Sequence, residues 1–136
     1  MTQPLKAPDS FFINGEWVRP RHGPMLEVVS PVTEEVIVRY PEAQPDDMDR
    51  AVAAARAAFD HGPWPRMAPS ERASYLRRVA SLIEARLEEI AWAWTRQVGA
   101  PVSLTRKLVP QNATLFRYYA ELIESYPFRD DRKRDD

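Results

Sequence analysis

The sequence predicts an α+β fragment, in which two N-terminal β-hairpins are followed by three α-helices. Two pairs of short runs rich in β-branched and aromatic residues fill positions 11–40, and each pair is joined by a turn. From position 45 onward, apolar residues recur every three or four positions, which is the spacing of an amphipathic helix. Proline and glycine then divide this second part of the chain into separate helices.

The two hairpins follow from their turn residues. In the first, over 11–18, Asn14 and Gly15 separate two apolar runs, and both residue types accept the positive φ of a type I′ turn. The second pairs Leu26–Ser30 with Glu35–Tyr40. Because no further strands follow, the outer edges of both hairpins are expected to lack a partner strand.

The three helices are predicted from apolar spacing and end signals. The first covers Pro45–Asp60, because proline suits the first helical position and several aspartates follow it. The second runs from Pro69 to Val98 and stops at Gly99, a favourable C-terminal residue. The third is placed at Val109–Tyr126, where aromatic and aliphatic residues recur at helical spacing.

The second helix is too long for a compact chain of this size. A continuous helix over 69–98 measures roughly 45 Å, whereas a compact chain of this length has a diameter of about 37 Å. We therefore expect these elements to pack on a larger body, either the rest of a longer chain or a partner subunit. The alternative is a kinked or shortened helix in a small three-helix domain.

Composition excludes several classes of function. The chain has 136 residues, with 19 Lys and Arg against 20 Asp and Glu, so no nucleic-acid or anionic-membrane partner is predicted. It has no cysteine, which excludes a thiolate zinc site and a cysteine nucleophile in this chain, and its 4 glycines form no phosphate-binding loop. No apolar run is long enough for a bilayer and no apolar signal core is present, so a cytoplasmic location is expected.

The groups that resemble functional sites are better explained structurally. Three aspartates, Asp46, Asp47 and Asp49, lie where a helix begins, so they are expected to complement its positive end and not to bind a metal. Arginines and glutamates alternate along the second helix, which predicts an exposed, ion-paired surface. Neither His22 nor His61 has an acidic residue placed to orient it. We predict no catalytic, cofactor-binding or metal-binding residue in this chain.

An ordered series of short motifs resembles the N-terminal segment of the aldehyde dehydrogenase superfamily. Phe12–Val18 (FINGEWV) resembles the opening of that family, and Ser30–Ile37 (SPVTEEVI) resembles its signature Asn-Pro-Ala-Thr-Gly-Glu-Val-Ile. Asp49–Phe59 (DRAVAAARAAF) is similar to the first helix of the family. Four further motifs follow in the family's order: Gly62–Trp64, Ser70–Arg72, Leu82–Glu84 and Arg117–Ala120. On this basis residues 1–10 are assigned as an extended arm, 11–128 as an incomplete aldehyde dehydrogenase domain, and 129–136 as a charged tail.

The resemblance implies a chemistry whose reacting groups lie outside this chain. Members of the family oxidise aldehydes to carboxylic acids with NAD or NADP, using a cysteine thiolate and a glutamate-activated water. These groups and the glycine-rich cofactor loops follow the matched region, so no catalytic or cofactor residue transfers to this chain. The implied partner is the remainder of an aldehyde dehydrogenase chain or a homologous subunit, and the chain alone is predicted to be inactive and to bind no cofactor.

Four residues stand at notable positions of the family pattern. Glu34 stands where the family has glycine, so a positive φ there strains it. Gln97 replaces an acidic residue that lies near a monovalent cation in some relatives, so we predict no ion at this position. The third helix contributes to the wall of the substrate entrance in relatives, which makes Gln111 and Phe116 weak candidates for that role. Packing is the alternative for both.

Two functions therefore remain open. The chain is the N-terminal part of an NAD(P)-dependent aldehyde dehydrogenase, or it is a non-catalytic interaction module that docks on a full-length relative or self-associates. The apolar stripe of the long helix and the unpaired strand edges favour the second hypothesis as well as the first.

Overall fold

The computed structural model describes residues 7–128 of the 136-residue chain. Most of the predicted arm, residues 1–6, and the charged tail, residues 129–136, lie outside the described residues. The elements are β1 (Phe11–Ile13), β2 (Glu16–Val18), β3 (Met25–Val29), β4 (Val36–Pro41), α1 (Pro45–His61), the short 3₁₀ helix η1 (Trp64–Arg66), α2 (Pro69–Ala85), α3 (Leu87–Val98) and α4 (Val102–Ser125).

Both predicted hairpins are present, and their turns have the expected chemistry. In the first, β1 and β2 pair antiparallel, and Asn14 and Gly15 have φ angles of 53° and 83°. These positive angles give the twist that a two-residue hairpin loop needs. The Phe12 and Trp17 rings lie opposite one another, with centroids 5.2 Å apart. This cross-strand pair adds to the hydrogen bonds of a very short sheet.

The second hairpin pairs β3 with β4, and Ser30 organises its turn. The buried Ser30 hydroxyl accepts hydrogen bonds from the backbone N–H groups of Val32 (3.3 Å) and Thr33 (3.2 Å). The Glu34 N–H donates to the Ser30 carbonyl at 2.9 Å, and Glu34 has a φ of 59°. The strain expected of a glutamate at this position is confirmed, because a side chain with a Cβ is disfavoured in the left-handed region.

The described residues form four α-helices and not three, because the predicted helix over 69–98 is divided at Arg86. Arg86 has φ −119° and ψ 19°, and its N–H bonds the carbonyl of Ile83, which ends α2 in a tight turn before α3 begins at Leu87. The predicted start and end of this helical region are confirmed: α2 begins at Pro69, and Gly99 ends α3 in the left-handed conformation, with φ 76°. The expectation of one continuous helix is therefore wrong.

The last helix begins seven residues earlier than predicted, at Val102 instead of Val109. Pro110 lies inside α4. A proline inside a helix lacks the N–H that would bond the carbonyl four residues before it. The helix begins instead directly after Pro101, where the N–H groups of Leu104 and Thr105 donate to the Pro101 carbonyl at 2.9 and 3.1 Å.

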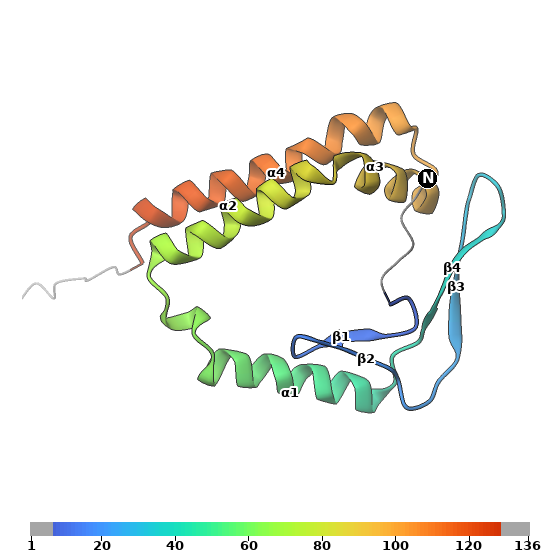
Figure 1. Ribbon diagram of the computed structural model, residues 1–136, viewed down its shortest axis with the longest axis horizontal. Coiled ribbons are helices and arrows are strands. Elements are labelled where there is room, and N and C mark those ends of the chain that lie inside the picture. Colours follow the sequence, from blue (N-terminus) through green and yellow to red (C-terminus); the bar gives the residue numbers. More distant parts are fainter. Residues whose placement is uncertain (1–6, 129–136) are drawn as a thin grey trace, which may run out of the picture.

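The buried core lies between the C-terminal helices. α4 runs antiparallel to α2 and also packs on α3 (Figure 1). Nearly all of the fully buried apolar residues among the described positions are alanines: Ala73, Ala80, Ala91, Ala113 and Ala120, joined by Val109. Because alanine has only a methyl group, the helix backbones can approach closely, but each contact removes little apolar surface from water.

The first half of the chain lies away from this core. Figure 1 shows α1 on the opposite side of the molecule from the α2–α4 pair, with β1 and β2 beside α1 and the β3–β4 hairpin at one end. The chain exposes 10899 Å², whereas a compact monomer of its mass exposes about 7,300 Å². Large apolar side chains such as Phe12, Val52 and Phe59 are at least 60 % exposed. The strands and helices over residues 11–125 therefore form an open arrangement with uncovered apolar faces. No described helix is long and apolar enough to span a membrane.

Candidate functional site

The two residues predicted for a substrate entrance, Gln111 and Phe116, both lie on α4 but on different sides of it. Gln111 is exposed and Phe116 is half-buried. Residues five positions apart on an α-helix are separated by roughly 140° around its axis. The structure therefore does not bring the two side chains together at one surface, and a role at a substrate entrance stays a prediction for each of them.

Gln111 belongs to an apolar strip that we call the outer face of α4. Its members are Leu104, Leu108, Gln111, Leu115, Tyr119, Leu122 and Tyr126, the last of which directly follows the helix. Leu104 is 45 % exposed, and Leu115, Tyr119 and Tyr126 are each 54 % exposed. The buried residues of the helix, including Thr105, Val109 and Ala113, lie roughly 120° away around its axis. α4 is therefore apolar on two faces, of which only one is covered.

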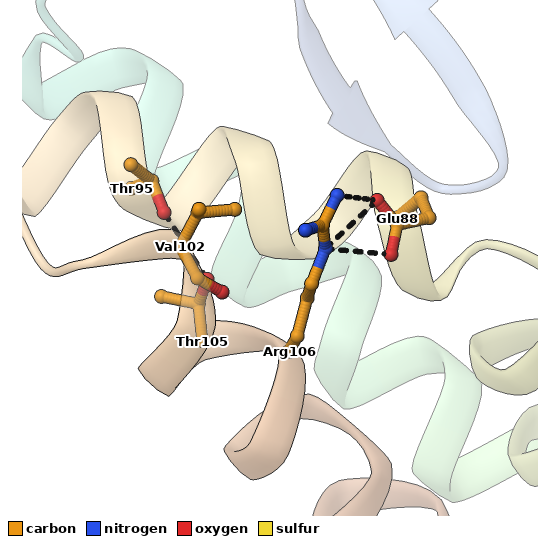
Figure 2. Close-up of polar contacts among 5 residues, drawn as sticks. All are labelled: Glu88, Thr95, Val102, Thr105 and Arg106. Carbon is orange, nitrogen blue, oxygen red and sulfur yellow. Dashed lines mark hydrogen bonds and ion pairs between the residues drawn. The ribbon is translucent and has the colours of Figure 1, made fainter.

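Polar contacts fix α3 against the first turns of α4 (Figure 2). The Arg106 guanidinium donates to both carboxylate oxygens of Glu88, with Nε–Oε1 at 2.9 Å and Nη2–Oε2 at 2.8 Å. Thr105 is fully buried, and its hydroxyl donates to the Val102 carbonyl at 3.0 Å. The Thr95 hydroxyl, 3.1 Å from that of Thr105, is therefore the donor in their contact. Arg106 lowers the pKa of Glu88 by hydrogen bonding, so this carboxylate stays charged.

Two further ion pairs connect α2 to α4, and each uses one residue of α2. Arg77 Nη2 lies 2.7 Å from Glu124 Oε2, and Arg117 Nη2 lies 2.6 Å from Glu84 Oε2. These hydrogen bonds lower the pKa of both glutamates. Arg86 is likewise paired, with Glu89 at 2.5 Å. The expectation of an ion-paired surface on this helix is confirmed, and the pairs hold the antiparallel register of α2 and α4.

Asp47, one of the three aspartates at the start of α1, serves as a cap. Its side chain is 2 % exposed and accepts a hydrogen bond from the Gln44 backbone N–H at 3.1 Å. It also forms an ion pair with Arg50. The Gln44 hydrogen bond is the main cause of a lowered pKa for Asp47, and Arg50 adds to it. Within residues 7–128 no group of three or more His, Cys, Asp or Glu side chains is placed to hold a metal ion.

Replacing Asp47 by asparagine is expected to remove a pH-dependent part of the stability. The folded pKa lies below its usual value, so the unfolded chain binds this proton first as the pH falls. The stabilisation by Asp47 is therefore complete above its usual pKa of about 4 and is lost as the pH falls through the lowered folded value. The urea midpoint of the Asp47→Asn variant should fall below that of the wild type at pH 7.

The difference between the two midpoints should become small once the pH has fallen below the lowered folded pKa of Asp47. Asp49→Asn is the matched control, because Asp49 lies on the same first turns of α1 but is exposed. It should leave the midpoint nearly unchanged at both pH values. Equal losses at pH 7 in the two variants would show that Asp47 acts only as one of several charges near the helix end.

A cavity of about 250 Å³ lies between the β3–β4 hairpin and α3. Ser30, Glu35, Trp92, Thr95 and Arg96 contribute to its lining. Two of its hydroxyl groups take part in structural hydrogen bonds: that of Ser30 accepts from N–H groups of the turn, and that of Thr95 contacts the Thr105 hydroxyl. The described arrangement thus positions helices and hairpins against one another, and its polar groups serve packing.

Sequence reasoning missed the junction of α3 with α4. Thr95 and Thr105 stand ten residues apart, and their contact depends on the sharp return of the chain at Gly99 and Pro101. The available signal was Pro101 itself, since a helix beginning directly after it places Thr105 and Val109 on one face.

Comparison with known proteins relates the whole arrangement to one family. The sequence model of the aldehyde dehydrogenase family matches residues 17–132. Aldehyde dehydrogenase family 2 member B4, a mitochondrial protein of Arabidopsis thaliana, is 46 % identical over 110 residues, which are 79 % of this chain and 20 % of that protein. The NADP/NAD-dependent aldehyde dehydrogenase PuuC of Escherichia coli (strain K12) is 35 % identical over 121 residues, 88 % of this chain and 24 % of that protein.

Solved structures show the same similarity. A variant of aldehyde dehydrogenase C from Pseudomonas syringae, crystallised with NAD⁺ and octanal, matches with a TM-score of 0.90 and 35 % identity over 98 % of this chain and 27 % of that chain. An NAD-dependent aldehyde dehydrogenase from Sinorhizobium meliloti matches with a TM-score of 0.79 and 41 % identity over 83 % of this chain and 23 % of that one.

The matches cover most of this chain but only a small part of its relatives. This chain spans about a fifth to a quarter of the length of the curated relatives that it matches. Because the family model extends over residues 17–132 and the folds agree over nearly the entire chain, the assignment does not depend on one motif. The chain belongs to the aldehyde dehydrogenase family.

Proposed function

We propose that this chain acts as the N-terminal part of an NAD(P)-dependent aldehyde dehydrogenase, an enzyme that oxidises an aldehyde to a carboxylic acid. The observation that carries the proposal is the match to the Pseudomonas syringae enzyme, which includes 98 % of this chain but 27 % of that chain. The part of the relative outside the match is the part that would bind NAD or NADP and react.

The residues of this chain support a scaffolding role within such an enzyme. The chain has no cysteine, so it cannot supply the thiolate that the family's reaction scheme uses. What it offers instead is a set of helices and hairpins whose apolar side chains, among them Val52, Phe59 and Leu115, remain exposed. The partner that fits these faces is the remainder of an aldehyde dehydrogenase chain, in the same polypeptide or in a homologous subunit.

A chimeric enzyme tests this proposal. The chain is joined in place of the matching N-terminal segment of the Pseudomonas syringae aldehyde dehydrogenase, with the rest of that enzyme in its active form. Octanal-dependent formation of NADH is then measured. We expect a rate within about tenfold of the parent enzyme, since tenfold corresponds to only about 1.4 kcal/mol in the barrier. The chain alone should give no NADH above the blank.

Two controls decide the interpretation. The Pseudomonas remainder without any N-terminal segment should be inactive, because the faces that this chain covers would be exposed to water. A folded chimera that binds NAD⁺ but does not oxidise octanal would overturn the proposal. So would turnover by the chain alone that scales with its concentration through purification.

A further inference from the structure

Asn14 and Gly15, the turn between β1 and β2, are also a chemically reactive pair. The chain has two asparagines, Asn14 and Asn112, and only Asn14 is followed by glycine. Both turn residues are exposed, and a Cβ at Gly15 would meet nothing within 4 Å. Among residues 7–128, no hydrogen bond holds the Gly15 N–H. Water and base therefore reach an asparagine whose neighbouring backbone nitrogen has no side chain to hinder it.

We propose that Asn14 is a site of spontaneous deamidation, and that opening of the β1–β2 hairpin controls its rate. Base removes the Gly15 N–H proton, and this nitrogen attacks Cγ of Asn14. The new N–Cγ bond closes a cyclic imide, while the Cγ–Nδ2 bond breaks and Nδ2 leaves as ammonia with a proton from water. Water then opens the imide at either carbonyl, which gives aspartate or isoaspartate without oxidation or reduction. This modification does not rest on the proposed function.

The folded turn holds the reacting atoms apart. Ring closure needs the Gly15 nitrogen and the Cβ of Asn14 on the same side of the Asn14 Cα–C bond, so that the nitrogen approaches Cγ. Asn14 has a φ of 53°, in the left-handed region, where ψ is about 47°. At that ψ the Gly15 nitrogen lies nearly opposite Cβ across the Cα–C bond. The Asn14 side chain therefore reacts only after the turn has opened and ψ has changed.

The β1–β2 hairpin is weakly held, so its turn opens readily. Each strand has 3 residues, and in the described part of the chain the two strands pair only with each other. A two-stranded hairpin is at most marginally stable in water. An open cavity of about 350 Å³, lined by the turn residues and by alanines of α1, lies between the turn and that helix. Local opening of such a segment needs less free energy than unfolding of the α2–α4 pair.

Isoaspartate at position 14 makes the opening permanent. Its main chain runs through the former side-chain carbons, so the two-residue loop gains one backbone atom. The length of this loop sets the register in which Ile13 lies opposite Glu16. The lengthened loop does not keep that register, so the rings of Phe12 and Trp17, with centroids 5.2 Å apart in the intact hairpin, separate.

Mass spectrometry of the full chain tests the site. The chain is incubated in native buffer at neutral and mildly alkaline pH, and its peptides are followed for replacement of an amide NH₂ by OH. An isoaspartate-specific methyltransferase identifies the isomer. We expect reaction at Asn14, faster at the higher pH because the attacking nitrogen must lose its proton. Asn112 is the internal control: it is exposed but lies within α4 and precedes Ala113, so it should stay unmodified.

Three variants test the control by the hairpin. Trp17→Ala removes the cross-strand ring pair, so the rate at Asn14 should rise about fivefold in native buffer and stay unchanged in urea, where no turn exists. Trp64→Ala is the matched control, because Trp64 is equally exposed, at 45 % against 47 %, but lies in η1. It should leave the rate unchanged. Gly15→Ala should slow the reaction in urea about tenfold or more, because its Cβ hinders the attacking nitrogen.

Four results would overturn the proposal. An unmodified Asn14 in native buffer would show that the hairpin does not open to a reactive form. Equal rates in native buffer and in urea, or an unchanged rate in Trp17→Ala whose helices circular dichroism shows to be intact, would show that the turn does not control the reaction. Modification of Asn112 at the rate of Asn14 would show that neither Gly15 nor the turn selects the site.

Discussion

Replacing Ala80 by leucine is expected to separate α2 from α4 and to lower the stability of the fold severely. Ala80 is fully buried in the middle of α2, where the α2 and α4 backbones pack closely. A leucine inserts three additional carbon atoms into this contact, and overpacking of this kind costs about 3 kcal/mol. Leucine has almost the helix propensity of alanine, so the loss reports packing and not helix formation.

The consequence is large because the core is small. Beyond its alanines, only Val109 and Thr105 are large, fully buried side chains among the described residues. A typical domain has a free energy of unfolding of about 5–15 kcal/mol. A chain that buries this little apolar surface is expected to lie at the lower end of that range. The urea midpoint, followed by the helical circular-dichroism signal, should therefore fall sharply in Ala80→Leu.

Ala85→Leu is the matched control for this substitution. Ala85 is the last residue of α2 and is exposed, so leucine there meets solvent and should change the stability by less than about 0.5 kcal/mol. Equal losses in the two variants would mean that leucine disturbs the helix itself. No loss in either would mean that α2 and α4 do not pack closely in solution.

The hairpins and the outer ends of the helices could be predicted because their signals are local. Asn14 and Gly15 accept positive φ by their own chemistry, Pro69 begins a helix, and Gly99 ends one. Each of these residues determines its conformation from the atoms of its own turn. The same holds for α1, which begins at Pro45 as predicted and ends one residue later than predicted, at His61.

The helix break at Arg86 and the start of α4 could not be predicted in the same way. Arginine has good helix propensity, so nothing local marks the residue at which α2 ends. The break depends on how α2 and α3 each pack on α4, which is a contact between residues far apart in the sequence. α4 also continues through Pro110, because a helix held by neighbours on one face tolerates an internal proline.

Some features of the candidate site could be predicted from the sequence alone. The absence of cysteine, read from the sequence, already excludes a thiolate nucleophile in this chain. Periodicity also identified the apolar residues of the last helix, including Leu115, Tyr119 and Leu122. It could not decide which of its two apolar faces is buried, since that depends on Thr105 and Val109 packing against α3. Gln111 and Phe116 were grouped together on the resemblance to the family, although the helix separates their side chains.

Replacing Gly99 by alanine is expected to loosen the β3–β4 hairpin from the end of α3. Gly99 has φ 76°, where a Cβ costs about 1–2 kcal/mol in any surroundings. It also lies against the hairpin turn: a Cβ at Gly99 would stand 3.0 Å from Pro31 Cγ and 3.5 Å from Val32 Cγ2. The proline ring cannot bend away, so the turn must shift, and the total cost should reach about 3 kcal/mol.

Gly15→Ala separates these two contributions. Gly15 has a similar φ of 83°, but a Cβ there meets nothing within 4 Å, so this variant reports the conformational cost alone. Gly99→Ala should lower the urea midpoint further than Gly15→Ala does, and hydrogen exchange should quicken at the Ser30 N–H, which donates to the Glu35 carbonyl in the hairpin turn. Equal midpoints and unchanged exchange at Ser30 would show that the hairpin is not held by α3. The contact at Pro31 would then not be what joins the N-terminal strands to the helices.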